Sequence, residues 1–210
     1  MKKIIILIAI ITLYSNTTYS QNACDVFNTT EMYWYGFDFS LAKMIGPDFN
    51  DPMKIRDDFF FSWNELVLKE SPKYNLQKFF RKSKVFYNLS VVNGRNFKVD
   101  YTKLVSYNNS DVVNLTDSAI SNEIETYNVS KDKGIGLVFF IESFNKFQQQ
   151  AYVSVVFFDI ATKTVLFVKK MNGKAVGVAF RNYWAGALFN IMKQCDKNYG
   201  AWKSEYCNKK

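Results

Sequence analysis

The stretch GIGLVFFIESFNKFQQQAYVSVVFFDIATKTVLFVKKMNG, residues 134–173, decides the fold of this chain. It contains three runs rich in β-branched and aromatic residues, at 134–146, 149–160 and 163–173, and such runs are typical of strands. Successive runs are separated by only a few residues, and connections this short join antiparallel neighbours. The stretch therefore predicts a three-stranded antiparallel meander in the second half of the chain.

Amphipathic segments on either side of the meander predict helices. After Pro52, apolar residues recur at helical spacing, and Asn50 or Asp51 is suited to cap the first turn. The final helix is predicted to begin near Arg181 and to run to Lys193 or beyond, with one apolar face. Two further helices are predicted at 75–82 and 116–127.

Two strands are predicted before the meander, at 31–39 and 84–92. Asn93-Gly94 is a strong signal for a tight turn, so residues 96–106 are either a hairpin partner of the second strand or an irregular edge. Strands and helices segregated in this way predict an α+β fold, with a mainly antiparallel sheet, helices packed on one face and a long C-terminal helix. Because no low-complexity linker divides the sequence, we expect residues 21–210 to form a single α+β domain.

The N-terminus predicts export. Met1-Lys2-Lys3 is basic, residues 4–13 are almost uninterrupted apolar sequence, and polar or small residues follow up to Ser20. This order is typical of a secretory signal peptide, here residues 1–20, and an apolar run of about ten residues is too short to span a bilayer. We therefore expect a periplasmic or extracellular protein with no transmembrane span after cleavage. A lipid anchor at Cys24 is disfavoured, since Gln21-Asn22-Ala23 lies between it and the end of the apolar run.

The formal net charge of the chain is +8. The basic residues are scattered, and only four of them are arginines, whereas nucleic-acid footprints cluster and rely on arginine. We therefore expect no nucleic-acid partner. The partners that suit an exported, mildly basic chain are an envelope protein, a lipid or a glycan.

Histidine is absent from the sequence. This excludes Ser–His–Asp and Cys–His nucleophilic sites and most catalytic zinc sites, and no metal or cofactor is predicted. Three cysteines in an exported chain predict one disulfide and one free thiol. The favoured pair is Cys195–Cys207, which would fasten the tail to the last helix. Pairing of Cys24 with either of them, or no bond at all, stays open.

Two arrangements could support catalysis without histidine. Ser40 and Lys43 fit the S-x-x-K spacing of serine–lysine enzymes, but the companion S-D-N and K-T-G elements are missing. The carboxylates Asp57-Asp58, Glu65 and Glu142 could serve glycoside hydrolysis in pairs, although the sequence brings no two of them together. Glu142 interrupts a very apolar run, and we expect it on the solvent face rather than paired with a lysine. No catalytic residue is assigned.

Aromatic residues supply the candidate binding site. In a strand, Tyr33 and Tyr35 share one face and Trp34 takes the other, so an exposed pair of rings could stack on a sugar, lipid or peptide. Arg181, at the start of the final helix, is a further candidate binding residue. Trp184 falls on the apolar face of that helix and is expected to be a structural anchor against the sheet.

Three phrases carry a resemblance. YGFDFSLAKMIG (35–46), YVSVVFFDIATKTVLFV (152–168) and GVAFRNYWAGAL (177–188), the last with its RNYW motif, are similar to an uncharacterised group of small secreted envelope proteins of Gram-negative bacteria. The similarity covers about half of the chain. It implies export and a sheet followed by a packing helix, and it carries over no catalytic residue.

Three functions follow as hypotheses. The first is a non-catalytic binding or assembly domain of the bacterial envelope. The second is a histidine-free hydrolase that uses Ser and Lys or carboxylates. The third is a carbohydrate-binding or adhesin-like surface protein that acts through the aromatic residues near Tyr33.

Overall fold

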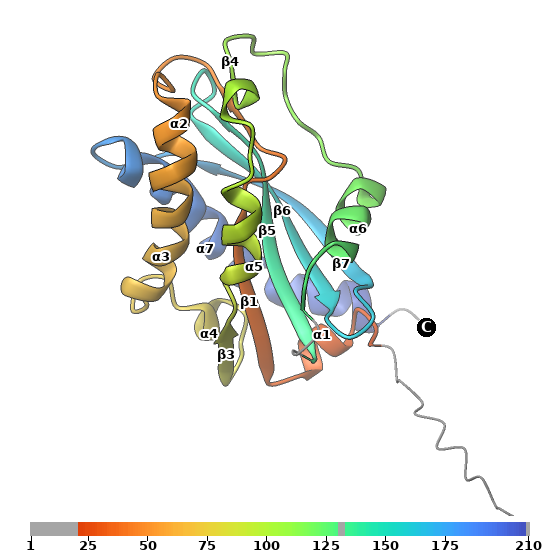
Figure 1. The fold of residues 1–210 in the computed structure, drawn as a ribbon. Coiled ribbons are helices and arrows are strands. Elements are labelled where there is room, and N and C mark those ends of the chain that lie inside the picture. The colour runs from red at the N-terminus through yellow and green to blue at the C-terminus, as the bar shows by residue number, and fades with distance from the viewer. Residues whose placement is uncertain (1–20, 130–132, 209–210) are drawn as a thin grey trace, which may run out of the picture.

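A computed structural model describes residues 21–129 and 133–208 of the chain (Figure 1). The predicted signal peptide, residues 1–20, lies outside the described residues. No helix in the described part is long and apolar enough to cross a membrane.

Seven strands of the described part of the chain form one sheet. They are β1 (Glu31–Asp38), β2 (Lys43–Ile45), β3 (Lys84–Tyr87), β4 (Val105–Ser106), β5 (Ile135–Asn145), β6 (Gln150–Asp159) and β7 (Val165–Lys174). β1 pairs in parallel with β3 and β5, and β2 pairs in parallel with β4 and β5. The β5–β6 and β6–β7 pairs are antiparallel. The expectation of a mainly antiparallel α+β sheet is therefore wrong: the sheet is mostly parallel, and the fold is α/β.

β5 is the central strand, and its complete burial was the sign that the sheet is not a mainly antiparallel one with a single covered face. β6 pairs along the whole of one of its edges, and β1 and β2 pair one after the other along the opposite edge. Every residue of β5 is buried. An uninterrupted apolar run is typical of a strand covered on both faces, as parallel strands are, whereas a half-exposed antiparallel strand alternates.

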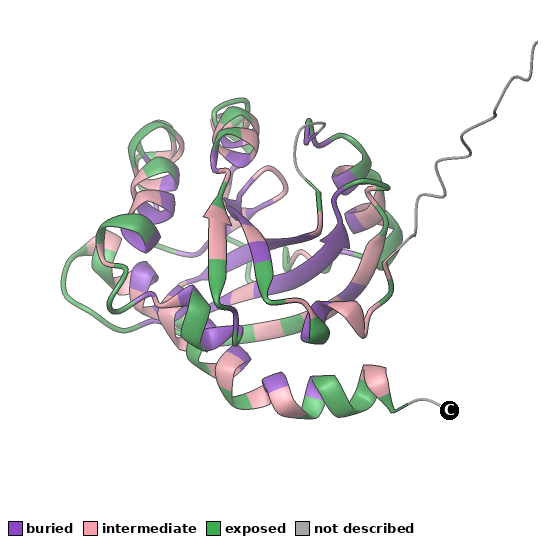
Figure 2. Cartoon of the chain, turned by 90° about the horizontal axis from the view of Figure 1, so that it is seen from below, coloured by how far each residue is buried: buried purple, intermediate pink, exposed green. Residues whose placement is uncertain are grey.

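Helices cover both faces of the sheet, so the expectation of helices on one face is also wrong. α7 (Phe180–Cys207) packs on one face, and α6 (Asp117–Glu125) packs on the other with help from α5 (Ser90–Asn96). In Figure 2 the buried strands lie between α7, which runs towards the C-terminus, and the helices opposite. The remaining helices are α1 (Asp25–Asn28), α2 (Pro52–Lys54), α3 (Phe60–Lys69) and α4 (Leu76–Phe79), with a π-helical turn at Ile55–Phe59 and a 3-10 turn at Tyr101–Lys103.

Two predicted helix starts are confirmed by their caps. The side chain of Asp51 accepts a hydrogen bond from the backbone N–H of Lys54 at the start of α2, where Pro52 occupies the first turn. The side chain of Thr116 caps α6 in the same way, through the N–H of Ala119.

The hairpin predicted over 84–106 is wrong. β3 ends at Tyr87, and the Asn93-Gly94 dipeptide lies inside α5 instead of forming a turn. The contacts of two side chains favour the helix. Val92 is buried in the core, and the side-chain amide of Asn96 forms hydrogen bonds with the backbone of Phe37, in β1, and of Phe39, just after β1. These tertiary contacts outweigh the local preference of Asn-Gly for a tight turn.

The disulfide joins Cys24 to Cys207, with a Cα–Cα distance of 4.9 Å, and Cys195 is a buried free thiol. The favoured Cys195–Cys207 pairing is wrong because α7 continues past both residues. Twelve residues of helix rise about 18 Å, well beyond the reach of a disulfide. The sulfur of Cys24 is committed to this bond, which leaves it no valence for a lipid thioether.

Candidate functional site

The structure divides the predicted aromatic cluster. Trp34 and Tyr35 are fully buried, on opposite faces of the sheet, so neither presents a ring to solvent. Tyr33 is half-buried and lies on the face of Tyr35, beyond the area that the helices cover. Of the three aromatic candidates, Tyr33 alone is placed to meet a ligand.

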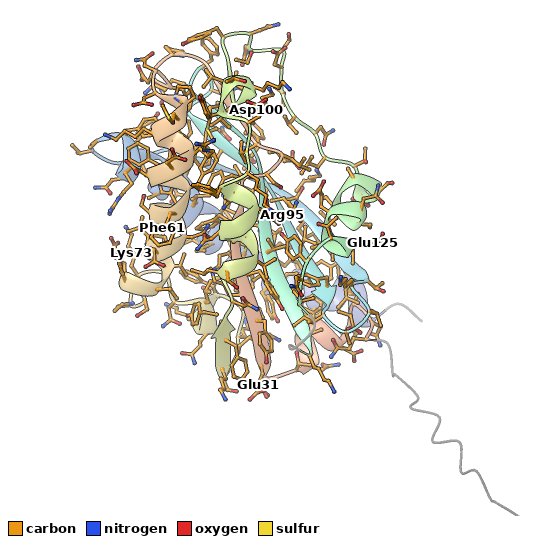
Figure 3. The ribbon with its side chains drawn as sticks, in the orientation of Figure 1. Glu31, Phe61, Lys73, Arg95, Asp100 and Glu125 are labelled. Carbon is orange, nitrogen blue, oxygen red and sulfur yellow. A yellow bond between two sulfur atoms is a disulfide. The ribbon has the colours of Figure 1, made fainter. Side chains whose placement is uncertain are left out.

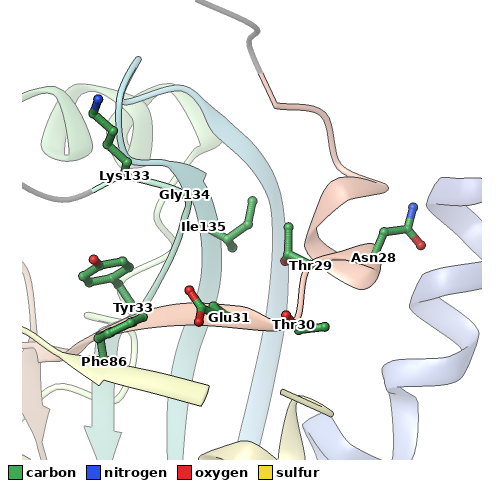
Figure 4. Close-up of a pocket in the computed structure, with 9 residues that line it drawn as sticks. All are labelled: Asn28, Thr29, Thr30, Glu31, Tyr33, Phe86, Lys133, Gly134 and Ile135. Carbon is green, nitrogen blue, oxygen red and sulfur yellow. The ribbon is translucent and has the colours of Figure 1, made fainter. Parts of the chain in front are cut away.

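Tyr33 lines a pocket of about 430 Å³, a size within the range of small-molecule sites (Figure 4). The pocket lies where β1 and β5 begin. Its wall consists of Asn28, Thr29, Thr30, Glu31, Tyr33, Phe86, Lys133, Gly134 and Ile135.

The apolar wall of the pocket is a stack of two rings. The centroids of Tyr33 and Phe86 lie 4.7 Å apart with an interplanar angle of 20°. The Nζ atom of Lys84 sits 4.2 Å from the centroid of Phe86 and closes that end of the stack. Since the pairing of β1 with β3 places Tyr33 directly opposite Phe86, strand register sets this arrangement.

The polar wall offers both signs of charge. In Figure 4 the Glu31 carboxylate rises from β1 beside Tyr33, and the Lys133 ammonium lies on the far side of the pocket from Phe86. Thr30 adds a hydroxyl group, whereas the Thr29 hydroxyl already accepts from Lys82 and the Asn28 amide already donates to Cys24. Because Lys84 and Tyr33 cover the Phe86 ring, the ring face left for a ligand is that of Tyr33. One aromatic face beside charged and hydroxyl groups suits a ligand with one apolar face and several hydroxyl groups.

Phe86, Glu31 and Lys133 were not foreseen as site residues. The alternation in KVFY (84–87) shows that Phe86 shares a strand face with Lys84. It does not show that this strand pairs in parallel with β1, and that pairing is what brings Phe86 to Tyr33.

Arg181 does not join this pocket. It lines a separate depression of about 380 Å³ between α7 and the end of α3, together with Glu70 and Lys73. Its Nη2 atom lies 3.9 Å from Oε1 of Glu70, and its backbone carbonyl accepts a hydrogen bond of 2.9 Å from the indole of Trp63. The two predicted binding elements, Tyr33 and Arg181, are thus parts of different surfaces.

The structure does not bring Ser40 and Lys43 together as a serine–lysine pair. Ser40 Oγ accepts a hydrogen bond of 2.9 Å from Arg95, and a guanidinium cannot take a proton from a serine. Lys43 Nζ donates instead to the backbone carbonyl of Lys103.

Glu142 is buried and forms an ion pair with Lys170, so the expectation of a solvated carboxylate is wrong. Its Oε1 atom also accepts a hydrogen bond of 2.5 Å from Ser154. The carboxylate lies at an irregularity of β5, between Ile141 and Ser143, where the register with β6 shifts. Bonding across three strands gives it a structural role at this bulge.

Two carboxylates do converge on Arg95, which projects from α5 in the middle of the molecule (Figure 3). Its Nε atom donates to Asp38 at 2.7 Å, and its Nη2 atom forms an ion pair with Glu123. Its Nη1 atom donates to Thr126 at 2.6 Å. Every nitrogen of the guanidinium is therefore engaged by protein atoms.

The surroundings of Arg95 hold the network in one state of charge. Burial opposes the charge of Arg95, but Asp38 and Glu123 outweigh it, so the pKa of Arg95 is raised. Burial, and then the neighbouring Asp38, raise the pKa of the Tyr127 hydroxyl, which donates to Asp38 at 2.7 Å. This network joins the end of β1 to α5 and α6. We interpret its role as structural and call it a structural lock, meaning that it stabilises the packing of these elements.

The predicted structural residues lie on or near α7. Trp184 is buried, with its ring stacked on Phe144 at 4.6 Å and on Phe49 at 5.5 Å. Cys207 carries the disulfide, and Cys195 packs with its sulfur 3.5 Å from that of Met171. Within residues 21–129 and 133–208, no group of three or more His, Cys, Asp or Glu side chains could hold a metal ion.

The chain matches no protein-family model, no curated protein and no solved structure. The similarity of its YGFDFS and RNYW motifs to secreted envelope proteins stays a prediction.

Proposed function

We propose that this chain is an exported, non-catalytic binding domain of the bacterial envelope whose ligand is a glycan held in the Tyr33–Phe86 pocket. The observation that carries the proposal is the Tyr33–Phe86 ring pair, which lies beside hydroxyl and charged groups where β1 and β5 begin. A pyranose ring has an apolar C–H face that packs on aromatic rings, and its hydroxyl groups need neighbouring donors and acceptors.

Export is supported by two observations. The sequence of residues 1–20 has the order of a signal peptide, and a disulfide joins Cys24 to Cys207. Disulfides persist in oxidising compartments, so this bond is compatible with a periplasmic or extracellular protein.

Glycan binding is tested by titrating the mature, oxidised protein with neutral and amino-sugar oligosaccharides and following backbone amide shifts. We expect shifts at β1, β3 and the start of β5. Tyr33→Ala should weaken binding by about tenfold, since loss of an aromatic stacking contact costs about 0.5–1.5 kcal/mol beyond the area lost.

Tyr87→Ala is the matched control. Tyr87 follows Phe86 on β3, is 42% exposed and points to the other face of the sheet, so its removal should leave the affinity unchanged. Shifts that map away from the pocket, or equal losses in the two variants, would count against this site.

A further inference from the structure

We propose that the opposite end of the molecule rests on a membrane that carries anionic lipid. The contact is made by the turn between β5 and β6 (146–149) and the loop between β7 and α7 (175–179), together called the loop surface. The inference is independent of the glycan pocket, which lies at the other end of β5.

The loop surface exposes three apolar side chains. Val178 is 86% exposed, Val176 is 57% exposed and Phe147 is 51% exposed. The two segments are neighbours, because the N–H of Ala175 donates a hydrogen bond of 2.8 Å to the carbonyl of Gln149. The β7–α7 loop projects from the body of the molecule at the left of Figure 1 (blue).

The loop is held in this exposed shape. Gly177 has a φ of 144°, and Ala179 has a φ of 64° with a ψ of 154°, a region that residues with a side chain rarely adopt. The backbone of α7 approaches so closely that a Cβ atom on Gly186 would lie 1.9 Å from the carbonyl oxygen of Val176. The N–H of Val176 also donates to the carbonyl of Tyr183 at 3.2 Å. The contacts with α7 and the unusual φ angles thus hold the loop in a shape that exposes Val176 and Val178.

The charges around the loop surface favour an anionic partner. Lys146, Lys174 and Arg181 flank the apolar side chains, and the whole chain is basic. Two acids are near, Asp48 beside Lys146 at 2.8 Å and Glu70 near Arg181 at 3.9 Å. Basic residues next to exposed apolar side chains are the pattern by which peripheral proteins bind anionic lipid surfaces.

The small apolar area favours a bilayer over a protein partner. A stable protein interface buries about 800 Å² on each side, usually around a well-packed apolar centre. Two valines and one phenylalanine on two loops fall short of such a centre. Shallow insertion into the headgroup region needs only a few apolar side chains and electrostatic attraction.

The test is co-sedimentation of the mature, oxidised protein with vesicles. We expect binding to phosphatidylethanolamine–phosphatidylglycerol vesicles and little binding to phosphatidylcholine vesicles. Val178→Asp should reduce the binding by at least about tenfold, because it places a carboxylate where the surface meets the lipid. Since Val178 is 86% exposed, the variant should melt at the temperature of the wild type.

Phe97→Asp is the control. Phe97 is 68% exposed after the end of α5, where Arg56 lies 5.6 Å from its ring, and it is not part of the loop surface. We expect it to bind vesicles as the wild type does. The proposal is overturned if the wild type ignores anionic vesicles, if Val178→Asp binds them normally, or if Phe97→Asp loses as much.

Discussion

Arg95 and Lys82 are two cations that the same fold buries by different means. Arg95 is 19% exposed at its side chain and is surrounded by carboxylates, among them Asp38, which is fully buried. Lys82 is 5% exposed, and its ammonium donates hydrogen bonds to uncharged oxygens. Both join distant parts of the chain, but of the two only Arg95 has carboxylate partners among residues 21–129 and 133–208.

The ammonium of Lys82 binds the end of α1. It donates to the carbonyl of Val26, to the carbonyl of Thr29 at 2.7 Å and to the hydroxyl of Thr29 at 3.3 Å. A lysine in this position satisfies the carbonyls that a helix leaves free at its C-terminus. Burial, and to a lesser degree the nearby Lys203, lower the pKa of Lys82 to about 8.

The difference indicates how each region is stabilised. At Arg95 the opposite charges offset the cost of burial, so the ion pairs themselves stabilise the contact of β1 with α5 and α6. At Lys82 the hydrogen bonds to uncharged oxygens offset only part of the cost of burying the cation, as its lowered pKa indicates. The disulfide from Cys24, next to α1, to Cys207 at the end of α7 supplies a covalent tie at that place.

Removal of Arg95 should have the largest effect on stability. Arg95→Met would leave the carboxylate of Asp38 fully buried without a cation, and we expect the free energy of unfolding at neutral pH to fall by about 4 kcal/mol. Urea denaturation measures this change. Glu123→Gln is the control, since Glu123 is 26% exposed and its loss leaves the Arg95–Asp38 pair intact. A loss below about 1 kcal/mol for Arg95→Met would contradict a structural lock.

Loss of the disulfide should come second. The double variant Cys24→Ser, Cys207→Ser should lose about 3 kcal/mol, within the range for a native disulfide. Hydrogen exchange should show where protection is lost: α1 and the end of α7 should open first, and α5 should stay protected. If α5 opened together with α1, the two regions would be one cooperative unit and the contrast between them would fail.

The sequence predicted local features, such as helix starts, better than long-range ones, such as strand pairing. Capping residues at Asp51 and Thr116 mark helix starts that depend on the next three residues, and both starts are confirmed. The parallel pairing of β1 with β3 and β5 joins segments far apart in the chain, and side-chain periodicity carries no direction of pairing. The continuous apolar run of β5 was the available signal for a strand covered on both faces.

Only part of the candidate site was predicted, because the rest depends on long-range strand pairing. Tyr33 was singled out because alternation assigns strand faces, but its partner Phe86 depends on the parallel register. Arg95 and Lys82 went unnoticed because nothing local separates them from surface cations. Their partners Asp38 and Thr29 lie more than fifty residues earlier in the chain.

The smallest expected effect, a dependence of stability on pH, tests the contrast most directly. Between pH 8 and 10.5 the unfolded chain keeps the proton of Lys82 that the folded chain has begun to release. The unfolded state then binds more protons, so Lys82 makes stability rise with pH in this window. Burial raises the pKa of the Cys195 thiol, whereas an exposed thiol titrates near about 8.5, so Cys195 makes stability fall over the same range.

The opposing thiol can be removed with Cys195→Ala as the background. In that background the free energy of unfolding should rise more steeply from pH 8 to 10 with Lys82 than with Lys82→Met. The difference should stay below about 1.4 kcal/mol per pH unit, the limit for one proton. The comparison ends near pH 10, because burial raises the pKa of Tyr74 to about 12 and ionisation of unfolded tyrosines then lowers stability. Equal slopes would mean that Lys82 titrates as an exposed lysine does, and that its cation is neutralised as well as that of Arg95.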